Sequence, residues 1–540
     1  MLPDARDYAT LIRDFRWAVP PRFNIGVACC DAWAAREPQR AAILTAHADG
    51  RVAATSYATL RQRSNQLANT LTRQGVTLGD RVAILLPQTE ELALAHLAAY
   101  KLGAIALPLA SLFGPDALEH RLKDAAAKAV VTNAAGAAKI AAIRATLPGL
   151  GAVFSIDGAD AALGVLDFHR EIARDSDAFT PCDTAADDPA LIIYTSGTTG
   201  PPKGALHGHR VMLGHLPGVE MALEFLPQPD DVFWTPADWA WAGGLLNILL
   251  PGLYLGVPVV ARKFERFDPD AAIDLMQRLK VRTGFLPPTA LRMLRAAAPR
   301  LLREKVRLRS LLSGGESLGA ATLAWGKEEL GISINEAYGQ SECNLVVSSC
   351  AAIGVLKPGF IGRPVPGHEV GVIRPDGNLC APDEQGQIAI RRPDPVMFLG
   401  YWNNEKATQA KFIGDWMTTG DEGHADTAGY IRFTGRGDDV ITSSGYRIGP
   451  GEIEDCLARH PAVAMAAAIG KPDPLRTEII KAFVVLAPGH EASEALAADI
   501  SAFVRARLSA HEYPREIVFE KELPMTTTGK VIRRLLRERG

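Results

Sequence analysis

The alternation of strand and helix patterns from about residue 25 restricts the possible folds more than any other feature. Short apolar runs predict buried strands at 81–87, 105–107, 129–132, 190–193, 257–261, 283–286 and 311–313. Helical patterns precede and separate them, for example at 24–36 and at 89–102, where Thr89 is the expected N-cap and Gly103 the expected stop. This order predicts doubly wound parallel sheets covered by helices, with ligands bound at the carboxyl ends of the strands.

The pattern changes over residues 360–435, where segments shorten, glycines recur and alternating stretches such as Gly386–Arg391 indicate antiparallel strands in a small β-barrel. A compact unit follows, with strands expected near 464–469, 480–486 and 517–520 and a helix at 495–508. A chain of 540 residues exceeds what one core usually supports. We therefore expect an α/β protein with a large domain at residues 1–436 and a smaller, mobile α+β domain at residues 437–540.

The composition excludes several classes of protein. The net charge of −3 offers no basic surface for nucleic acid, and seven cysteines without a CxxC pair suit free thiols in a reducing compartment. The uncharged run 239–261 is long enough to cross a bilayer, but its two prolines and four glycines favour a buried helix and strand. We expect a cytoplasmic enzyme without a membrane span.

A loop rich in glycine and hydroxyl residues follows the strand at 190–193, in the stretch Tyr194-Thr-Ser-Gly-Thr-Thr-Gly-Pro-Pro-Lys-Gly204. It offers backbone N–H groups, several hydroxyls and the Lys203 ammonium to one small volume, as a polyphosphate requires. The spacing is not that of a Walker loop. Because linkers seldom follow a buried strand in this way, we predict a triphosphate-binding loop rather than a flexible linker.

A second motif, Glu336-Ala-Tyr-Gly-Gln-Ser-Glu342, offers parts of a nucleotide site. The ring of Tyr338 supplies a flat face for a purine, a hydroxyl follows three residues later, and Glu342 is a hard oxygen ligand of the kind that Mg²⁺ prefers. Upstream, the glycines of Ser313-Gly-Gly-Glu316 would let the backbone approach an adenine closely.

A third pair of motifs, Trp416-Met-Thr-Thr-Gly-Asp421 and Gly435-Arg436, places a carboxylate and a guanidinium in nearby segments. An aspartate can accept hydrogen bonds from both ribose hydroxyls, and an arginine adds a fixed fork of donors. From the residues alone, an Asp–Arg surface pair is the alternative. His207 and His209 match no metal-ligand spacing, and we expect them to be structural.

Taken together, these motifs closely resemble the signature of the adenylate-forming superfamily of acyl-CoA synthetases, adenylation domains and luciferases. The resemblance runs from about residue 25 to the end and rests on five ordered motifs. It implies that Tyr338 binds adenine, Ser341 the α-phosphate and Asp421 with Arg436 the ribose, while Glu342 and Thr198 bind magnesium. The full set of ATP- and AMP-binding residues that it implies is Thr195, Ser196, Gly197, Thr198, Thr199, Gly200, Lys203, Gly315, Glu316, Ser317, Glu336, Ala337, Tyr338, Gly339, Gln340, Ser341, Asp421, Arg436 and Lys530.

Three C-terminal features acquire a role only through this resemblance. Asp438, otherwise an acidic turn, becomes the hinge of the small domain. The stretch 443–449, otherwise a glycine-containing hairpin turn, becomes the CoA-binding loop, with Ser444, Gly445, Tyr446 and Arg447 as its contacts. Lys530, in Pro524-Met-Thr-Thr-Thr-Gly-Lys530, becomes a catalytic residue beside Lys203 and Glu342.

The reaction that the resemblance implies uses ATP, Mg²⁺ and coenzyme A as well as a carboxylic acid. The acid is converted to an acyl-adenylate with release of pyrophosphate, and its acyl group then passes to the CoA thiol. The surroundings of Lys530 also resemble a site at which a lysine acyltransferase and a deacylase regulate such enzymes, because acylation removes the charge.

The substrate is less defined than the reaction. Acetate-specific relatives carry tryptophan where this chain has Gly339, so we expect a deeper acyl pocket, with Trp241 as a wall and Val346 in its lining. Residues 434–450 look closest to medium-chain acyl-CoA synthetases, which favours a short- to medium-chain fatty acid. Acetate, propionate and benzoate remain open, as do three other functions: loading of a carrier protein, silent nucleotide binding and a luciferase-like oxygenase.

Overall fold

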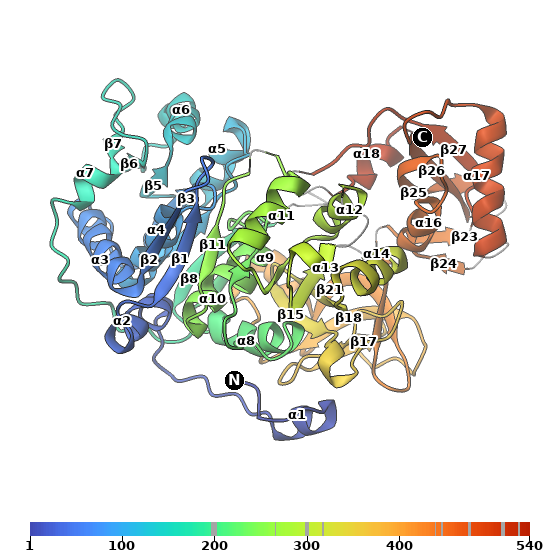
Figure 1. The fold of residues 1–540 in the computed structure, drawn as a ribbon, viewed down its shortest axis with the longest axis horizontal. Coiled ribbons are helices and arrows are strands. Elements are labelled where there is room, and N and C mark those ends of the chain that lie inside the picture. Colours follow the sequence, from blue (N-terminus) through green and yellow to red (C-terminus); the bar gives the residue numbers. More distant parts are fainter. Residues whose placement is uncertain are drawn as a thin grey trace.

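The computed structural model of the protein describes residues 1–195, 202–264, 266–297, 302–315, 318–437, 439–443, 446–473, 477–508, 513–526 and 530–539. The described strands form four sheets, two of which interleave along the chain (Figure 1). A large N-terminal domain contains three of these sheets with their helices, and a smaller C-terminal domain is built around the fourth sheet at one end of the molecule (Figure 1). The mixed α/β class that the sequence predicts is confirmed.

The first sheet has eight strands in the order β19-β9-β8-β4-β3-β5-β6-β7, parallel from β8 to β7 and antiparallel at the β9–β19 edge. Its strands are β3 (Arg81–Leu85), β4 (Ile105–Pro108), β5 (Ala129–Thr132), β6 (Ala152–Ser155), β7 (Leu166–Asp167), β8 (Pro189–Tyr194), β9 (Gly204–Gly208) and β19 (Gly400–Tyr401). The connecting helices are α3 (Tyr57–Arg73), α4 (Glu90–Leu102), α5 (Pro115–Asp124), α6 (Ala134–Ile143) and α7 (Phe168–Ile172).

Helix α4 shows how local sequence sets these bounds. The Thr89 side chain accepts a hydrogen bond from the Leu92 amide at the start of the helix. Gly103 ends the helix in the left-handed conformation, with φ of 69°, which glycine adopts without strain. Both ends lie where the sequence predicts them.

The second sheet has nine strands in the order β16-β15-β14-β13-β12-β10-β11-β1-β2 and is parallel from β14 to β1. The strands are β1 (Ala41–Ala46), β2 (Val52–Ser56), β10 (Phe233–Trp234), β11 (Val259–Ala261), β12 (Thr283–Phe285), β13 (Ser310–Gly314), β14 (Ile334–Gln340), β15 (Cys343–Ser348) and β16 (Arg363–Pro364). Helices in this half of the domain are α8 (Val211–Ala222), α11 (Pro269–Arg278), α12 (Pro288–Ala297), α13 (Leu302–Lys305) and α14 (Ala320–Trp325).

The uncharged run 239–261 forms buried structure inside this domain. It contains the consecutive helical segments α9 (Ala242–Gly244), η3 (Leu245–Leu249) and α10 (Leu250–Leu255), followed by β11. Within the described ranges, no helix is long and apolar enough to cross a membrane. The predicted buried helix and strand are therefore confirmed.

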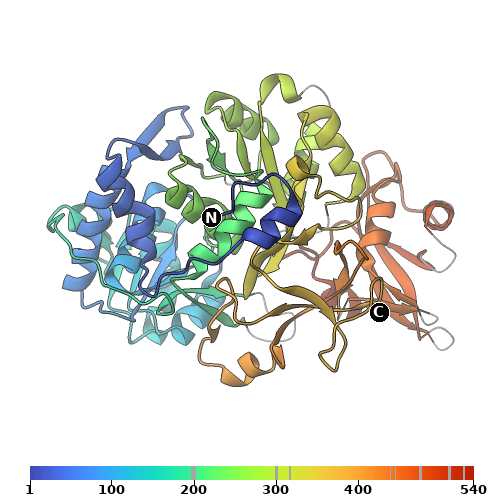
Figure 2. The same cartoon turned by 90° about the horizontal axis from the view of Figure 1, so that it is seen from below.

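The N-terminal segment packs along the second-sheet half, where Figure 2 shows α1 (Tyr8–Asp14) beside α8. The Arg6 guanidinium lies 4.0 Å from the centroid of the Phe225 ring, just beyond α8. The expected helix at 24–36 forms as a π-helical turn, η1 (Val27–Asp31), that continues into α2 (Ala32–Arg36).

The third sheet is antiparallel and five-stranded, with β17 (Val370–Ile373), β18 (Gly386–Arg391), β21 (Trp416–Ala425) and β20 (Phe412–Ile413) in order and β22 (Ile431–Arg436) paired to β21. It occupies the region where we expect a small barrel. Among the described strands, its pairings form an open path rather than a closed ring. Helix α15 (Glu405–Gln409) precedes β20.

The fourth sheet contains β23 (Ile441–Ser443), β24 (Tyr446–Ile448), β25 (Val463–Asp473), β26 (Thr477–Leu486) and β27 (Glu516–Phe519), with helices α16 (Pro450–Leu457), α17 (Glu494–Arg507) and α18 (Arg533–Arg537). Asp439 forms ion pairs with Arg533 and Arg537 of α18. Arg533 also binds Glu454 of α16 at 2.7 Å. These ion pairs fix the last helix to the first residues of this unit.

Candidate active site

The base of the predicted phosphate loop is closed by hydrogen bonds. The Thr195 amide donates to the Lys203 carbonyl at 2.9 Å, because β8 and β9 are antiparallel neighbours. His120 Nε2 of α5 donates to the Pro202 carbonyl at 3.1 Å. Ser196, Gly197, Thr198, Thr199 and Gly200 lie outside the described residues.

Lys203 and Glu342 meet at one aromatic side chain. The Lys203 ammonium lies 5.2 Å from the centroid of the Tyr401 ring, within the range of a cation–π contact. The Tyr401 hydroxyl donates a hydrogen bond to Oε1 of Glu342, which is 6% exposed. Tyr401 therefore contacts the predicted phosphate residue Lys203 through its ring and the predicted magnesium residue Glu342 through its hydroxyl. The sequence motifs did not indicate a role for Tyr401.

The purine and ribose motifs also come together. The Tyr338 hydroxyl donates to Oδ2 of Asp421 at 2.6 Å, and Arg436 Nε lies 3.3 Å from Oδ1 of the same carboxylate. Asp421 on β21 and Arg436 on β22 are register partners, while Tyr338 arrives from the second sheet. Asp421 is therefore buried and bound to the predicted adenine residue, while the side chain of Arg436 stays largely exposed at the edge of the site.

Burial controls the electrostatics of this carboxylate. Asp421 is 6% exposed, and this burial raises its pKa above the usual range, although Arg436, Tyr338, Lys411 and Lys530 act in the opposite direction. Two hydroxyl donors such as those of a ribose would supply the hydrogen bonds that a buried carboxylate needs.

Lys411 is a functional candidate that the motifs do not reveal. Its ammonium donates to Gln340 Oε1 at 2.8 Å and to the Thr418 carbonyl at 3.0 Å. Burial lowers the pKa of Lys411, while Glu342 and Asp421 oppose this effect. The Lys411 side chain thus interacts electrostatically with both the predicted magnesium ligand Glu342 and the predicted ribose ligand Asp421.

Glu336 lies at the middle of β14, beside the predicted adenine residues Ala337 and Tyr338. Burial raises the pKa of Glu336 to about 7. Gly315, at the end of the adjacent strand β13, has φ of 91°, a left-handed conformation suited to glycine. Glu316 and Ser317 lie outside the described residues.

Lys530 of the C-terminal domain faces this site. A Cβ atom built on Gly315 would lie 4.0 Å from the Lys530 ammonium, and the charge of Lys530 acts on Asp421. The backbone of Lys530 is held by hydrogen bonds to and from Thr526 at 3.0 and 2.7 Å. The structure therefore brings Lys530, Asp421 and Tyr338 together although they are far apart in the sequence.

The donor set fits a magnesium ion bound through the nucleotide. Glu342 supplies one buried carboxylate, and only one of its oxygens receives the Tyr401 hydroxyl. No group of three His, Cys, Asp or Glu side chains suited to a metal occurs in the part of the chain that the structure describes. One carboxylate plus substrate phosphates is the usual way in which proteins hold Mg²⁺.

The two histidines after the loop are structural, as expected. His207 Nε2 donates to the carbonyl of Ser341 at 2.8 Å, and burial lowers the pKa of His207 to about 4. Burial lowers the pKa of His209 to about 4 as well. Neutral His207 thus positions the Ser341 backbone.

The predicted acyl residues lie on separate elements. Trp241 packs edge-to-face against Phe113 with ring centroids 5.8 Å apart, and Val346 is fully buried on β15. A Cβ atom on Gly339 would lie 2.2 Å from the Leu345 amide nitrogen. Close backbone packing therefore requires glycine at 339 whatever the substrate, so its presence does not by itself indicate a deep pocket.

The C-terminal motifs are only partly described. Asp438, Ser444 and Gly445 lie outside the described residues, and so do the side chains of Tyr446 and Arg447, whose backbone belongs to β24.

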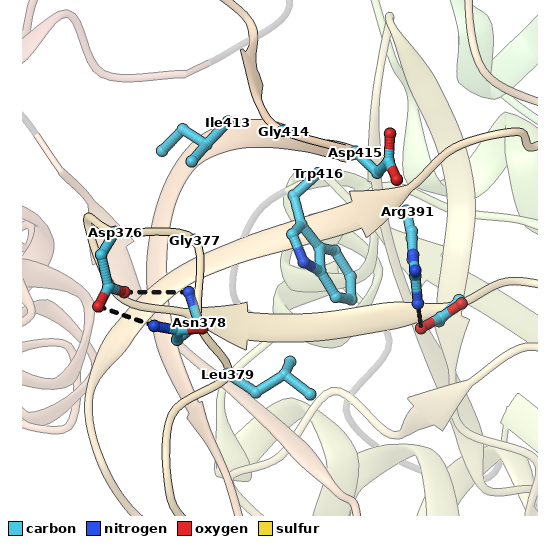
Figure 3. Close-up of a pocket in the computed structure, with 10 residues that line it drawn as sticks. Asp376, Gly377, Asn378, Leu379, Arg391, Ile413, Gly414, Asp415 and Trp416 are labelled. Carbon is cyan, nitrogen blue, oxygen red and sulfur yellow. Dashed lines mark hydrogen bonds and ion pairs between the residues drawn. The ribbon is translucent and has the colours of Figure 1, made fainter.

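A separate hollow of about 450 Å³ lies on the third sheet (Figure 3). Leu379 and Trp416 line it together with the Arg391–Glu369 ion pair of 3.0 Å. The hollow contains none of the predicted nucleotide, acyl or CoA residues, and we assign it no part in the site.

Comparisons with known proteins agree with this geometry. The model of the family described as AMP-binding enzyme matches residues 30–402, and that of the AMP-binding enzyme C-terminal domain matches residues 452–530. The chain is 36% identical to an acetyl-coenzyme A synthetase of Bacillus subtilis (89% of this chain, 84% of that protein). It is 34% identical to the mitochondrial acyl-coenzyme A synthetase ACSM2 of Rattus norvegicus (96% and 92%). The crystal structure of a Brucella canis acyl-CoA synthetase superposes with a TM-score of 0.76 at 37% identity, covering 99% of each chain.

Proposed function

The chain belongs to the AMP-binding enzyme family and is an AMP-forming acyl-CoA synthetase, and from this premise we propose that it activates short- to medium-chain fatty acids. The observation that supports adenylate formation is the convergence of Tyr338, Asp421 and Arg436 with Lys530 of the other domain, while the acyl length rests on the resemblance of residues 434–450 to medium-chain acyl-CoA synthetases. This grouping combines a nucleoside-binding carboxylate with a cation for the reacting end of the nucleotide.

In the first half-reaction, a carboxylate oxygen of the acid bonds to the α-phosphorus of ATP, and the bond from that phosphorus to pyrophosphate breaks. Asp421 and Arg436 hold the ribose, and Lys203 with residues 195–200 holds the departing phosphates. Lys530 pairs with the negative charge that gathers around the α-phosphorus, an interaction that is strongest in the transition state. Gln340 and Ser341 complete the contacts around the α-phosphate.

Glu342, together with Thr198, would hold magnesium against the phosphates of ATP. When bound, the ion would neutralise part of the negative charge of these phosphates. Tyr401 fixes the orientation of the Glu342 carboxylate, so it acts as a positioning residue.

In the second half-reaction, the CoA thiol attacks the acyl carbonyl, the thioester bond forms, and AMP leaves as the acyl–phosphate bond breaks. We place this step on Ser444, Gly445, Tyr446 and Arg447. Residues 437–540 would rotate about Asp438 relative to residues 1–436, removing Lys530 and delivering that loop.

The direct test measures pyrophosphate release and acyl-CoA formation across acetate, propionate, butanoate, hexanoate, octanoate, dodecanoate and benzoate, with and without CoA. The proposal expects turnover that depends on CoA and is greatest between about four and ten carbons, with soft discrimination because each methylene contributes only ~0.8 kcal/mol. A maximum at acetate or benzoate would contradict the substrate class. Turnover without CoA would point to a carrier protein or another acceptor, and no pyrophosphate release would indicate a silent nucleotide binder.

Two further properties follow from the same proposal. Acylation of Lys530 by a lysine acyltransferase, reversed by a deacylase, would remove the cation from the first half-reaction. Enzyme acetylated at Lys530 should therefore lose adenylate formation, and an unchanged rate would contradict this regulation.

The seven free cysteines fit a cytoplasmic location, which fractionation of cells would test.

A further inference from the structure

Three side chains form a hydrogen-bonded chain beside Gly339, outside the motifs of the nucleotide site. His215 lies on α8, Asn344 on β15 and Asn247 in η3. The amide nitrogen of Asn344 lies 3.1 Å from His215 Nε2 and 2.7 Å from Asn247 Oδ1. A Cβ atom on Gly339 would lie 2.6 Å from the Asn344 Cα, so the backbone that carries the Asn344 amide borders Gly339 of the expected acyl site.

The orientation of both amides is fixed by chemistry. His215 Nδ1 lies 2.8 Å from the Val211 carbonyl, which can only accept, so Nδ1 carries the proton. Burial lowers the pKa of His215 to about 3, so the ring is neutral and its Nε2 accepts a hydrogen bond from the Asn344 NH₂ group. The second N–H of that group donates to Asn247 Oδ1.

This arrangement leaves one acceptor and one donor group available. They are Asn344 Oδ1 and Asn247 Nδ2, for which no hydrogen bond is recorded within the described residues. Their chain neighbours Leu345, Val346, Leu246 and Ile248 are buried and apolar. Asn344 is only half-buried, and neither atom is among the fully buried polar atoms that lack a partner, so both can be reached by a bound group that donates and accepts.

Asn247 also belongs to the helical segment that begins immediately after Trp241, the expected wall of the acyl site. Trp241 and Gly339 thus connect the amide pair to the acyl site through two different elements. A hydroxyl group on the tail of the acid could donate to Asn344 Oδ1 and accept from Asn247 Nδ2.

We propose that Asn344 and Asn247 form a polar end to the acyl site and select acids whose tail carries a hydroxyl group over plain alkyl acids of equal length. This inference rests on the proposed function, because it assumes that Gly339 and Trp241 line the acyl site. His215 is a positioning residue, since it fixes the Asn344 amide without touching the substrate.

The test compares kcat/KM for paired acids: butanoate with 4-hydroxybutanoate, pentanoate with 5-hydroxypentanoate, and hexanoate with 6-hydroxyhexanoate. A site built for a hydrogen-bonding group discriminates strongly against an analogue that lacks it. We expect the natural chain to prefer the hydroxy acid at one length by at least about tenfold. In Asn344→Leu, which replaces the amide with an apolar group of similar size, we expect the ratio to invert or approach one.

Asn335→Leu is the matched control. Asn335 is also a buried amide of the second sheet, but its side chain binds the Ala222 carbonyl at 2.9 Å and the Ala351 amide at 2.9 Å instead of Asn344 or Asn247. We expect this control to keep the wild-type ratio. AMP affinity checks the folding of each variant, and Asn247→Leu serves as a second probe if Asn344→Leu loses AMP binding.

The two hypotheses fail in different ways. If the natural chain forms acyl-CoA from neither member of any pair, the proposed function fails. If it forms acyl-CoA but treats both members equally, or if Asn344→Leu and Asn247→Leu leave the ratio within about twofold, only the polar-end inference is overturned.

Discussion

The substitution Asp421→Asn should lower nucleotide affinity while leaving the folded protein at least as stable. Burial raises the pKa of Asp421 despite Arg436, so ionising this carboxylate costs more free energy in the folded state than in the unfolded chain. An asparagine of the same shape removes that cost and still accepts the Tyr338 hydroxyl, now 2.6 Å from Oδ2. Nucleotide binding should weaken, because the uncharged asparagine replaces the ionised carboxylate that would accept hydrogen bonds from the ribose hydroxyls.

The expected size follows from the hydrogen bonds. A hydrogen bond to a charged group contributes ~1.5–3 kcal/mol. Its loss corresponds to an increase of roughly 10-fold to 100-fold in the Kd of AMP and ATP. Calorimetric titration with AMP measures the affinity, and urea unfolding without nucleotide at pH 7.5 measures the stability.

Asp231→Asn is the matched control, because Asp231 is buried and paired with Arg309 at 2.8 Å outside the site. We expect it to lower the free energy of unfolding and to leave AMP affinity unchanged. The reasoning would be refuted if Asp421→Asn kept AMP affinity within twofold, or if it destabilised the protein as much as the control.

Three further predictions concern the same site. Lys411→Met should raise the KM for ATP by about tenfold or more in initial-rate assays, because Gln340 loses a charged donor worth ~1.5–3 kcal/mol; an unchanged KM would remove Lys411 from the site. Glu336→Gln should match the wild type in urea unfolding at pH 4.5 and exceed it at pH 8 by up to roughly 3 kcal/mol. The sign follows because the folded-state pKa of Glu336, about 7, lies above the ordinary value of 4.5. The stability that Glu336 contributes is therefore full below pH 4.5 and is lost as the pH rises through 7. Equal stabilities of the two proteins at pH 8 would contradict this prediction. Glu342→Gln should shift the magnesium dependence of pyrophosphate release to higher concentration, and a superimposable titration would argue against Glu342 as the ligand.

Much of the framework is encoded locally. The buried strands at 81–85, 105–108 and 129–132 were predictable because each is a short apolar run between helices with clear ends. The residues of the phosphate, adenine and ribose motifs were predictable because each chemistry requires particular side chains close together in sequence. The contacts of Tyr338 and Arg436 with Asp421 agree with the expectations for the adenine and ribose motifs.

Other parts of the site depend on contacts across the fold. Lys411 lies in a polar stretch with no motif, and its burial arises only when β20 and β21 form a hairpin beside β14. Tyr401 reaches Glu342 across 59 positions of sequence. Gly339 suggested a deep acyl pocket when it was considered from the sequence alone. The structure gives another reason for glycine at this position, because the Leu345 backbone lies 2.2 Å from where its Cβ would be.

The ion pairs of Asp439 have a mechanical consequence for the proposed rotation. Asp439 directly follows the predicted hinge and binds Arg533 and Arg537, while Arg533 lies three residues beyond Lys530. A change in backbone angle at 438 would thus be transmitted through α18 to Lys530, the proposed catalytic lysine. Substituting Asp439 would remove these ion pairs. The two domains could then still rotate, but Lys530 would no longer be positioned correctly against the nucleotide.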